Sequence, residues 1–204
     1  MSGWNEDDLE TVHFYEHRLG QFGEDARSLN WGSRQSQERR FEVLASIGDL
    51  ANQSILDVGC GLGDFYRWLV SRGIQTDYTG IDLTPGMVEK AASRNPSARF
   101  AVHNLLGDTA PFQEKSFDFV FASGIFYLRR IQPQEYMQEM ISTMFCIARK
   151  GVAFNSLSTW SAERDALEYY ADPIKTLEWC AELSKNLILR HDYHPGDFSI
   201  LMKK

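Results

Sequence analysis

The sequence is poor in cysteine, and its cysteines do not form a metal-binding or disulfide pattern. The 204 residues include three, Cys60, Cys146 and Cys180. An odd number of widely separated cysteines lacks the paired spacing of zinc ligands or of a disulfide framework. We therefore expect three free thiols in a reducing compartment, the cytoplasm.

Long apolar runs are also missing. No stretch approaches the roughly 20 apolar residues that a transmembrane helix needs. The first eight residues, MSGWNEDD, are acidic, whereas a signal peptide begins with basic residues and continues into an apolar run. We therefore expect neither a membrane span nor a signal peptide.

Positive charge is in the minority, with 21 Lys and Arg against 28 Asp and Glu and a formal net charge of −7. Nucleic-acid binding usually relies on a basic face. The densest basic cluster, Arg34 with Arg39 and Arg40, lies among polar residues on an expected helix, and a solvated helix face accounts for it. The composition therefore argues against nucleic acid as a partner.

Strand-like apolar runs alternate with helix-like segments from residue 54 onward, which is typical of a parallel sheet covered on both faces. Strands are expected at 54–59, 78–82, 98–103, 117–123 and 151–155, and helices at 5–20, 33–50, 64–72 and 133–150 and after Pro85 and Pro173. Two more apolar runs, at 187–189 and 198–201, flank Pro195-Gly196 and predict a C-terminal β-hairpin. The pattern predicts a three-layer α/β fold in one domain.

A glycine-rich turn follows the first expected strand, in Asp57-Val58-Gly59-Cys60-Gly61-Leu62-Gly63. Glycines at alternate positions allow a tight bend and a close approach of a ligand to the main chain. Neither register of G-x-G-x-x-G is met, because the third glycine would fall at Asp64 or Tyr66. Asp64 at the start of the next helix would repel a phosphate. The turn favours a ligand with an ammonium group over a dinucleotide, and a turn without a ligand is the alternative.

An acidic residue, Asp82, closes the second expected strand. A carboxylate at this place can accept hydrogen bonds from both ribose hydroxyls of an adenosine. Its alternative role is to cap the following helix. Thr84 is itself a suitable cap residue, so the ribose role is favoured.

The turn at 57–63, Asp82 and the strand Phe117-Asp118-Phe119-Val120 together resemble motifs of the class I S-adenosylmethionine-dependent methyltransferases. The resemblance covers residues 54–204, including the hairpin, which in that family adds an antiparallel strand at the sheet edge. It implies a Rossmann-like sheet of seven strands, mostly parallel, and S-adenosylmethionine as cofactor. Residues 1–50 would form a helical cap segment and residues 51–204 the core. Residues 31–33 and 36–41 are similar to the N-terminal segment of uncharacterised bacterial members, which names no substrate.

The resemblance also implies, by position, which residues contact each part of the cofactor. The backbone at residues 59–61 would line the methionine moiety, Asp57 would orient the ammonium, and Asp82 would hold the ribose. The implied cofactor-binding residues are Asp57, Gly59, Cys60, Gly61, Gly63, Asp82, Leu83, Met87, Asn104, Leu105, Ser123 and Gly124. Among them, Leu83 and Met87 would pack on the adenine, whereas Ser123 and Gly124 would approach the methionine end.

Two positions are candidates for the residue that faces the adenine amino group. The family usually places an acid after the third strand, where this chain has Asn104 with Leu105 beside it. An asparagine carbonyl can accept from an amino group without charge. Asp108 is the alternative candidate for this role. Asn104 is also equally compatible with a simple turn position.

For methyl transfer the protein mainly has to position the two reactants and exclude water, because the cofactor carries the electrophilic methyl group. A general base is needed only for an acceptor that is protonated at the working pH, so no catalytic residue is assigned. Tyr15, Trp31, Phe126 and Tyr127 are candidates for the acceptor pocket, where aromatic faces could also favour a cationic centre. Plain packing is the alternative for each.

The histidines do not predict a metal site. His191 and His194, if they lay on a strand, would point their rings to opposite faces of the sheet. We therefore interpret them, like His103, as surface or core residues.

The sequence thus predicts a methyltransferase that acts on oxygen, nitrogen or carbon of a small molecule. The acidic composition and the lack of an appended recognition domain favour a small acceptor. A protein acceptor, or an S-adenosylmethionine-binding regulator or pseudoenzyme, are the alternatives. The failed G-x-G-x-x-G registers argue against a NAD-dependent oxidoreductase. The sequence specifies neither the acceptor nor the oligomeric state.

Overall fold

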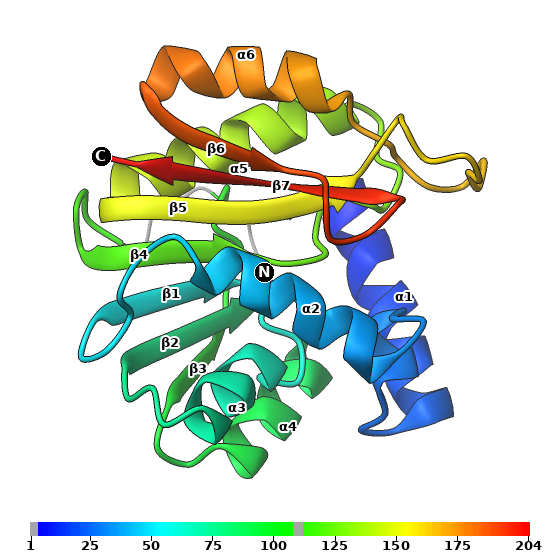
Figure 1. Ribbon diagram of the computed structural model, residues 1–204. Coiled ribbons are helices and arrows are strands. Elements are labelled where there is room, and N and C mark those ends of the chain that lie inside the picture. Colours follow the sequence, from blue (N-terminus) through cyan, green and yellow to red (C-terminus); the bar gives the residue numbers. More distant parts are fainter. Residues whose placement is uncertain (1–3, 108–111) are drawn as a thin grey trace.

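The computed structural model describes residues 4–107 and 112–204, and a seven-stranded sheet with the order β3-β2-β1-β4-β5-β7-β6 forms its centre (Figure 1). The strands are β1 (Ser54–Val58), β2 (Asp77–Asp82), β3 (Arg99–Val102), β4 (Phe117–Ala122), β5 (Ala148–Leu157), β6 (Asn186–Arg190) and β7 (Asp197–Lys203). Strands β1 to β5 are parallel to one another, whereas β7 is antiparallel to both β5 and β6. The predicted mostly parallel sheet with a C-terminal hairpin is confirmed.

Helices cover both faces of the sheet and complete the three predicted layers. They are α2 (Arg34–Ala45), α3 (Asp64–Ser71), α4 (Pro85–Arg94), α5 (Pro133–Ile147) and α6 (Pro173–Leu183). On one face, α2 and α3 pack through Phe41, Phe65 and Trp68. On the other face, α5 and α6 pack through side chains that include Met140 and Cys180. Helix α4 packs on β2 and β3. Burial from both sides explains the apolar runs within β1 and β4, at residues 55–56 and 119–122.

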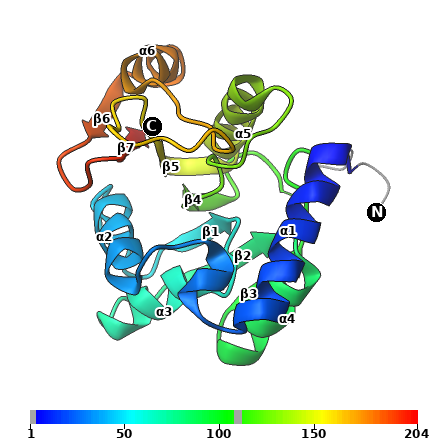
Figure 2. The ribbon, with the colours of Figure 1, turned by 90° about the vertical axis from the view of Figure 1, so that its right-hand side faces the viewer.

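An N-terminal helix, α1 (Glu6–Phe22), and a 3-10 helix, η1 (Ala26–Leu29), lie at the carboxyl ends of the strands, in front of the sheet in Figure 2. A capping box between Asn5 and Asp8 begins α1. Asp8 is 4% exposed; it forms an ion pair with Arg130 and accepts a hydrogen bond from the Asn104 amide at 2.7 Å. These buried contacts fix α1 to the rest of the domain.

Two helices end earlier than the sequence predicts. The expected helix at 33–50 stops at Ala45, where the Ser46 hydroxyl donates to the Val43 carbonyl and competes with the helical ladder. The expected helix at 133–150 stops at Ile147, and β5 begins at once with Ala148. Arg149 donates to the Lys115 carbonyl at 2.9 Å, which ties this part of the chain to the residues that precede β4. A local side-chain contact therefore accompanies the end of the first helix, whereas a contact distant in sequence accompanies the end of the second.

The cysteines, the helices and the possible metal ligands can each be compared with the sequence predictions. All three cysteines are free thiols. Within residues 4–107 and 112–204, no helix is both long and apolar enough to cross a bilayer. In the same residues, no three His, Cys, Asp or Glu side chains gather as metal ligands would.

The anchoring of α1 gives a test by substitution. Asp8→Ala leaves the Arg130 guanidinium, whose side chain is 6% exposed, without its main partner, and breaking a buried ion pair from one side costs about 3 kcal/mol or more. Urea unfolding should show this loss in free energy of unfolding. Glu38→Gln removes an exposed ion pair with Arg34 and should cost less than about 1 kcal/mol. Equal effects of the two substitutions would contradict the anchoring role.

Candidate functional site

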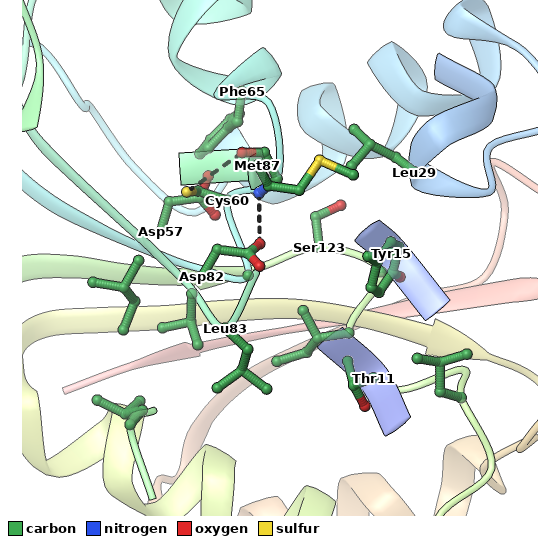
Figure 3. Close-up of a pocket in the computed structure, with 18 of the residues that line it drawn as sticks. Thr11, Tyr15, Leu29, Asp57, Cys60, Phe65, Asp82, Leu83, Met87 and Ser123 are labelled. Carbon is green, nitrogen blue, oxygen red and sulfur yellow. Dashed lines mark hydrogen bonds between the residues drawn. The ribbon is translucent and has the colours of Figure 1, made fainter. Parts of the chain in front are cut away.

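A cavity lies at the carboxyl ends of β1, β2 and β4, beside α1 and η1, and is termed here the strand-end cavity (Figure 3). It brings together nearly all the residues that the sequence proposed for cofactor binding. Those that line it are Asp57, Gly59, Cys60, Gly61, Asp82, Leu83, Met87, Asn104, Leu105, Ser123 and Gly124. Gly63 does not: it precedes α3, and a Cβ built there would lie 2.7 Å from the Asn95 amide and 3.0 Å from the Phe100 ring.

The turn after β1 requires glycine where it borders the cavity. Gly59 and Gly61 have φ angles of 72° and 51°, which L side chains rarely adopt. A Cβ on Gly59 would lie 2.2 Å from the Ile125 side chain, and one on Gly61 would lie 2.6 Å from the Leu29 side chain. The main chain of the turn is therefore in close contact with the segments that cover it.

Asp82 joins this turn to the start of α4. Its Oδ2 accepts from the Gly61 N–H at 2.9 Å, and its Oδ1 accepts from the Thr84 N–H at 2.9 Å. The Thr84 hydroxyl caps no helix N–H, so the premise that Thr84 relieves Asp82 of a structural role was wrong. A carboxylate has about four lone-pair sites, so one site on each oxygen remains after these two hydrogen bonds. A structural role and a ligand-binding role are therefore compatible.

Asp57 is a buried carboxyl at the end of β1. It accepts a hydrogen bond from the Tyr78 hydroxyl of β2. Burial raises the pKa of Asp57 to about 7; the Tyr78 hydrogen bond opposes this rise, and the charges of Asp82 and Asp64 add to it. Asp57 therefore changes its charge near neutral pH, and a cation placed beside it would favour the ionised form.

Acidic side chains dominate the charge around the strand-end cavity. Asp57, Asp64 and Asp82 all line it. Arg130, which also lines it, is already paired with Asp8, and Asp64 has its own partner in Arg94 at 3.2 Å. The balance favours a cationic or zwitterionic ligand over a phosphate, as the sequence predicted.

The amide of Asn104 is largely engaged within the protein. Its Nδ2 donates to Asp8, and its Oδ1 accepts from the Leu106 N–H at 3.1 Å. One acceptor site on Oδ1 remains. The rival position, Asp108, lies outside the described residues. Sequence reasoning missed Asp8 and Arg130, because their pairing spans 122 positions along the chain.

A second cavity, with a volume of about 620 Å³, adjoins the first and is termed the hairpin cavity. It is bordered by residues that follow β4, by a loop after β5 and by the turn between β6 and β7. Leu29, Trp31 and Gly124 line both cavities. A Cβ on Gly124 would lie 2.7 Å from the Trp31 ring, so this indole stands at the boundary between them.

The four aromatic residues proposed for an acceptor pocket each line one or both of the two cavities. Tyr15 lines the strand-end cavity, Phe126 and Tyr127 line the hairpin cavity, and Trp31 lines both. The Tyr15 hydroxyl donates to the Tyr127 hydroxyl at 3.1 Å, which connects α1 to the segment after β4. Residues that the sequence did not indicate also line the strand-end cavity, among them Thr11, Gln37, Phe41, Ile125, Leu128, Tyr136 and Met140.

The N-terminal segment occupies much of the strand-end cavity. The volume that remains in this cavity is about 100 Å³, which is below the roughly 300–1,000 Å³ of typical small-molecule sites. Leu29 lies against Gly61 and Trp31 against Gly124. The space available at the strand ends therefore depends on the position of these two side chains.

Comparison with known proteins finds methyltransferases. A family model described as a methyltransferase domain matches residues 55–145. Rv1506c of Mycobacterium tuberculosis, which carries a provisional methyltransferase name, is 37% identical over 162 residues; the match covers 74% of this chain and 93% of that protein. A trans-aconitate 2-methyltransferase of Rhodopseudomonas palustris is 32% identical over 85 residues, 42% of this chain and 32% of its own length. A demethylmenaquinone methyltransferase of Tropheryma whipplei is 33% identical over 107 residues, 52% of this chain and 43% of its own length. The chain thus spans less than half the length of these last two relatives.

Solved structures share the fold. Magnesium protoporphyrin IX methyltransferase of Synechocystis, with bound S-adenosylhomocysteine, has a TM-score of 0.68 at 13% identity, covering 98% of this chain and 100% of that one. The [4+2]-cyclase SpnF has a TM-score of 0.70 at 14% identity, covering 100% and 98%. At these identities the likeness shows the fold alone, and the cyclase illustrates that a fold does not fix the reaction.

The raised pKa of Asp57 predicts how stability depends on pH. The folded pKa of about 7 exceeds that of an unfolded aspartate. The contribution of this carboxyl to stability is therefore present below the unfolded pKa and is lost as pH rises to about 7. Asp57→Asn removes this dependence on pH. Between pH 5.5 and 8, the free energy of unfolding of the variant should therefore rise by about 2 kcal/mol relative to that of the wild type. Urea titrations of both proteins across this range measure the difference, and parallel curves would contradict the assignment.

Proposed function

This chain belongs to the class I S-adenosylmethionine-dependent methyltransferases, and we propose that it methylates a small molecule bound in the hairpin cavity. The observation that carries the proposal is the boundary shared by two cavities. The strand-end cavity holds the residues expected to bind the cofactor, and the hairpin cavity meets it at Trp31 and Gly124. An acceptor in the hairpin cavity would be next to the methionine end of the cofactor.

The residues of the strand-end cavity fit S-adenosylmethionine. Asp82 retains an acceptor site on each oxygen for the two ribose hydroxyls. Asp57 would hold the ammonium with a carboxylate that is otherwise bonded to Tyr78, and the closely packed turn at Gly59 and Gly61 would allow backbone contact with the methionine moiety. When bound, the cofactor supplies a methyl group on a positively charged sulfur.

The other proposed contacts are with the adenine and with the methionine end of the cofactor. Leu83 and Met87 offer apolar surface for the adenine, and Asn104 offers one acceptor site for its amino group. Ser123 and Gly124 would lie at the methionine end. The Asn155 side chain holds this pair in place, since its Oδ1 accepts from the Gly124 N–H at 2.8 Å and its Nδ2 donates to the Ser123 hydroxyl at 3.1 Å.

The N-terminal residues would act as a cap. We propose that residues 1–50 form the cap segment and residues 51–204 the core, with α1 and η1 over the strand ends while α2 joins the helical layer on one face of the sheet. Leu29 and Trp31 would move away from Gly61 and Gly124 to admit the cofactor and then exclude water from the reacting groups. The cap would thereby contribute through exclusion of solvent, with no chemical step of its own.

A small acceptor is supported by the hairpin cavity, because about 620 Å³ is the size of a typical small-molecule site. The net charge of −7 supports an acceptor other than nucleic acid. We also propose a cytoplasmic location, on the basis of the three free thiols.

The role of Asp82 can be tested by cofactor binding. Asp82→Asn keeps the shape of the side chain but removes its charge, and losing charge-assisted hydrogen bonds of about 1.5–3 kcal/mol should weaken binding by roughly ten- to a hundredfold. Titration calorimetry with S-adenosylhomocysteine measures this change. Asp77→Asn, at the other end of β2 and exposed, is the matched control and should bind like the wild type. A folded Asp82→Asn variant with unaltered affinity would remove the basis of the cofactor site.

A further inference from the structure

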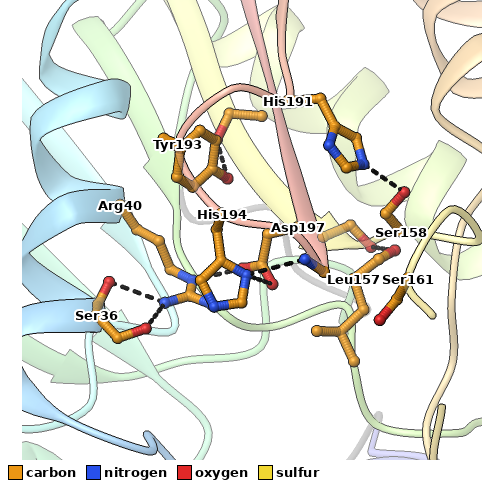
Figure 4. Close-up of polar contacts among 12 residues, drawn as sticks. Ser36, Arg40, Leu157, Ser158, Ser161, His191, Tyr193, His194 and Asp197 are labelled. Atoms are coloured by element: carbon orange, nitrogen blue, oxygen red, sulfur yellow. Dashed lines mark hydrogen bonds and ion pairs between the residues drawn. The ribbon is translucent and has the colours of Figure 1, made fainter. Parts of the chain in front are cut away.

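Carboxylates outnumber cations in the lining of the hairpin cavity. The Lys, Arg, Asp and Glu side chains that line it are Arg40, Glu163, Glu168 and Asp197. Arg40 and Asp197 form an ion pair with side chains only 6% and 4% exposed, so these two charges neutralise each other (Figure 4). Among the described residues, neither glutamate forms an ion pair with a Lys or Arg side chain. Two negative charges therefore remain without a partner.

The histidine that lines this cavity does not offset them. His194 lies in the turn between β6 and β7, and its Nδ1 accepts from the Gly196 N–H at 3.1 Å. Burial lowers the pKa of His194; Asp197 opposes this, while Arg40 and His191 contribute to the lowering. The ring is therefore neutral at pH 7. His194 and His191 are not on a strand, so the sequence argument about opposite faces of a sheet was wrong for them.

The structure holds Glu168 in a defined position on the cavity wall. Its backbone forms an antiparallel bridge with Leu128, and the N–H of the next residue, Tyr169, donates to the Tyr127 carbonyl at 2.8 Å. These contacts tie the loop after β5 to the segment after β4. The Tyr170 hydroxyl donates to Oε2 of the half-buried Glu168 at 2.6 Å and orients the carboxylate. Its Oε1 accepts no hydrogen bond from the described residues and is available to a ligand.

Aromatic side chains form much of the remaining wall. Those that line the cavity are Trp31, Phe126, Tyr127 and Tyr170. The face of an aromatic ring attracts a cation, and the Arg40 guanidinium already lies over the Trp31 ring, with Cζ 4.8 Å from the ring centre. The Glu168 charge acts on this wall, because burial raises the pKa of Tyr127 to about 12 and that charge adds to the rise. The cavity therefore joins aromatic surface to unbalanced negative charge.

These features exclude several ligand classes. Two unpaired glutamates would repel a carboxylate or a phosphate. Arg129 and Arg164 lie on the same segments but do not line the cavity; they donate to the carbonyls of Ala166 at 2.7 Å and Ser161 at 3.4 Å. Since no three possible metal ligands gather within residues 4–107 and 112–204, the lining favours an organic cation over a metal ion.

Resting on the proposed function, we propose that the methyl acceptor is a small organic molecule with an ammonium group, which binds Glu168 while the apolar part of the molecule packs against the aromatic wall. An ammonium group supplies N–H donors for Oε1 and a charge that balances the lining. Tyr170 is a positioning residue for the carboxylate. The exposed Glu163 adds attraction at longer range. A protonated nitrogen has no lone pair, so the methyl group goes to a different atom of the same molecule.

The acceptor class can be tested with three probes that share one ring, namely benzylammonium, benzyl alcohol and benzoate. With S-adenosylhomocysteine present, benzylammonium should bind roughly tenfold more tightly than benzyl alcohol, because hydrogen bonds to a charged group are the stronger ones. Proton–nitrogen spectra of ¹⁵N-labelled protein measure both affinities and should show the Trp31 indole signal shifting. Equal affinities, tighter binding of benzoate, or binding that leaves the Trp31 signal unchanged would overturn the proposal.

The role of Glu168 can be tested by removing its charge alone. Glu168→Gln keeps an oxygen that can accept from the Tyr170 hydroxyl, so the wall should stay in place. Affinity for benzylammonium should fall roughly tenfold, whereas that for benzyl alcohol should not change. Glu178→Gln, exposed on α6 and outside the lining, removes the same charge and should bind benzylammonium like the wild type. Equal losses in the two variants, or no loss in Glu168→Gln, would contradict the assignment.

Cofactor binding separates this inference from the proposed function. Glu168 and Glu178 do not line the strand-end cavity, so both variants should bind S-adenosylhomocysteine like the wild type. A wild-type protein that binds S-adenosylhomocysteine but prefers no ammonium probe would refute only the acceptor class. A wild-type protein that binds no S-adenosylhomocysteine would refute the proposed function, and this inference with it.

Discussion

The pair of hydrogen bonds that Asp82 accepts from the N–H groups of Gly61 and Thr84 is the constraint on which the site depends. It fixes the glycine-rich turn after β1 and the first turn of α4 to one carboxylate, so the two segments that border the strand-end cavity cannot move independently. The close packing of the turn follows, since glycines with positive φ are the residues that tolerate this approach. Because the hydrogen bonds use only part of the carboxylate's capacity, the group that shapes the site also remains able to bind within it.

The parts of the fold and site that rest on local sequence were predictable. Strand β1, the turn at 57–63 and Asp82 occupy consecutive or near positions, and each has a direct physical signature in residue type and spacing. The helix ends were less predictable, because the end of α5 depends on where Arg149 finds its partners across the sheet. Sequence propensity carries no information about such a contact.

Interactions between distant positions could not be predicted in this way. The ion pair of Arg40 with Asp197 joins residues 157 positions apart, and that of Asp8 with Arg130 joins residues 122 apart. Each looks like an ordinary surface charge in the sequence, and only the fold buries it beside a cavity. His194 is a further case: as an isolated histidine near a turn it has no distinguishing pattern, and only the fold places its Nδ1 3.2 Å from the buried carboxylate of Asp197.

The indole of Trp31 belongs to the walls of both cavities. A shift of this ring that enlarges one chamber alters the shape of its neighbour, so occupancy of either is energetically linked to occupancy of the other. Such linkage is reciprocal by thermodynamic necessity. Two ligands that meet at this ring would therefore change each other's affinity by the same factor, whichever of them binds first.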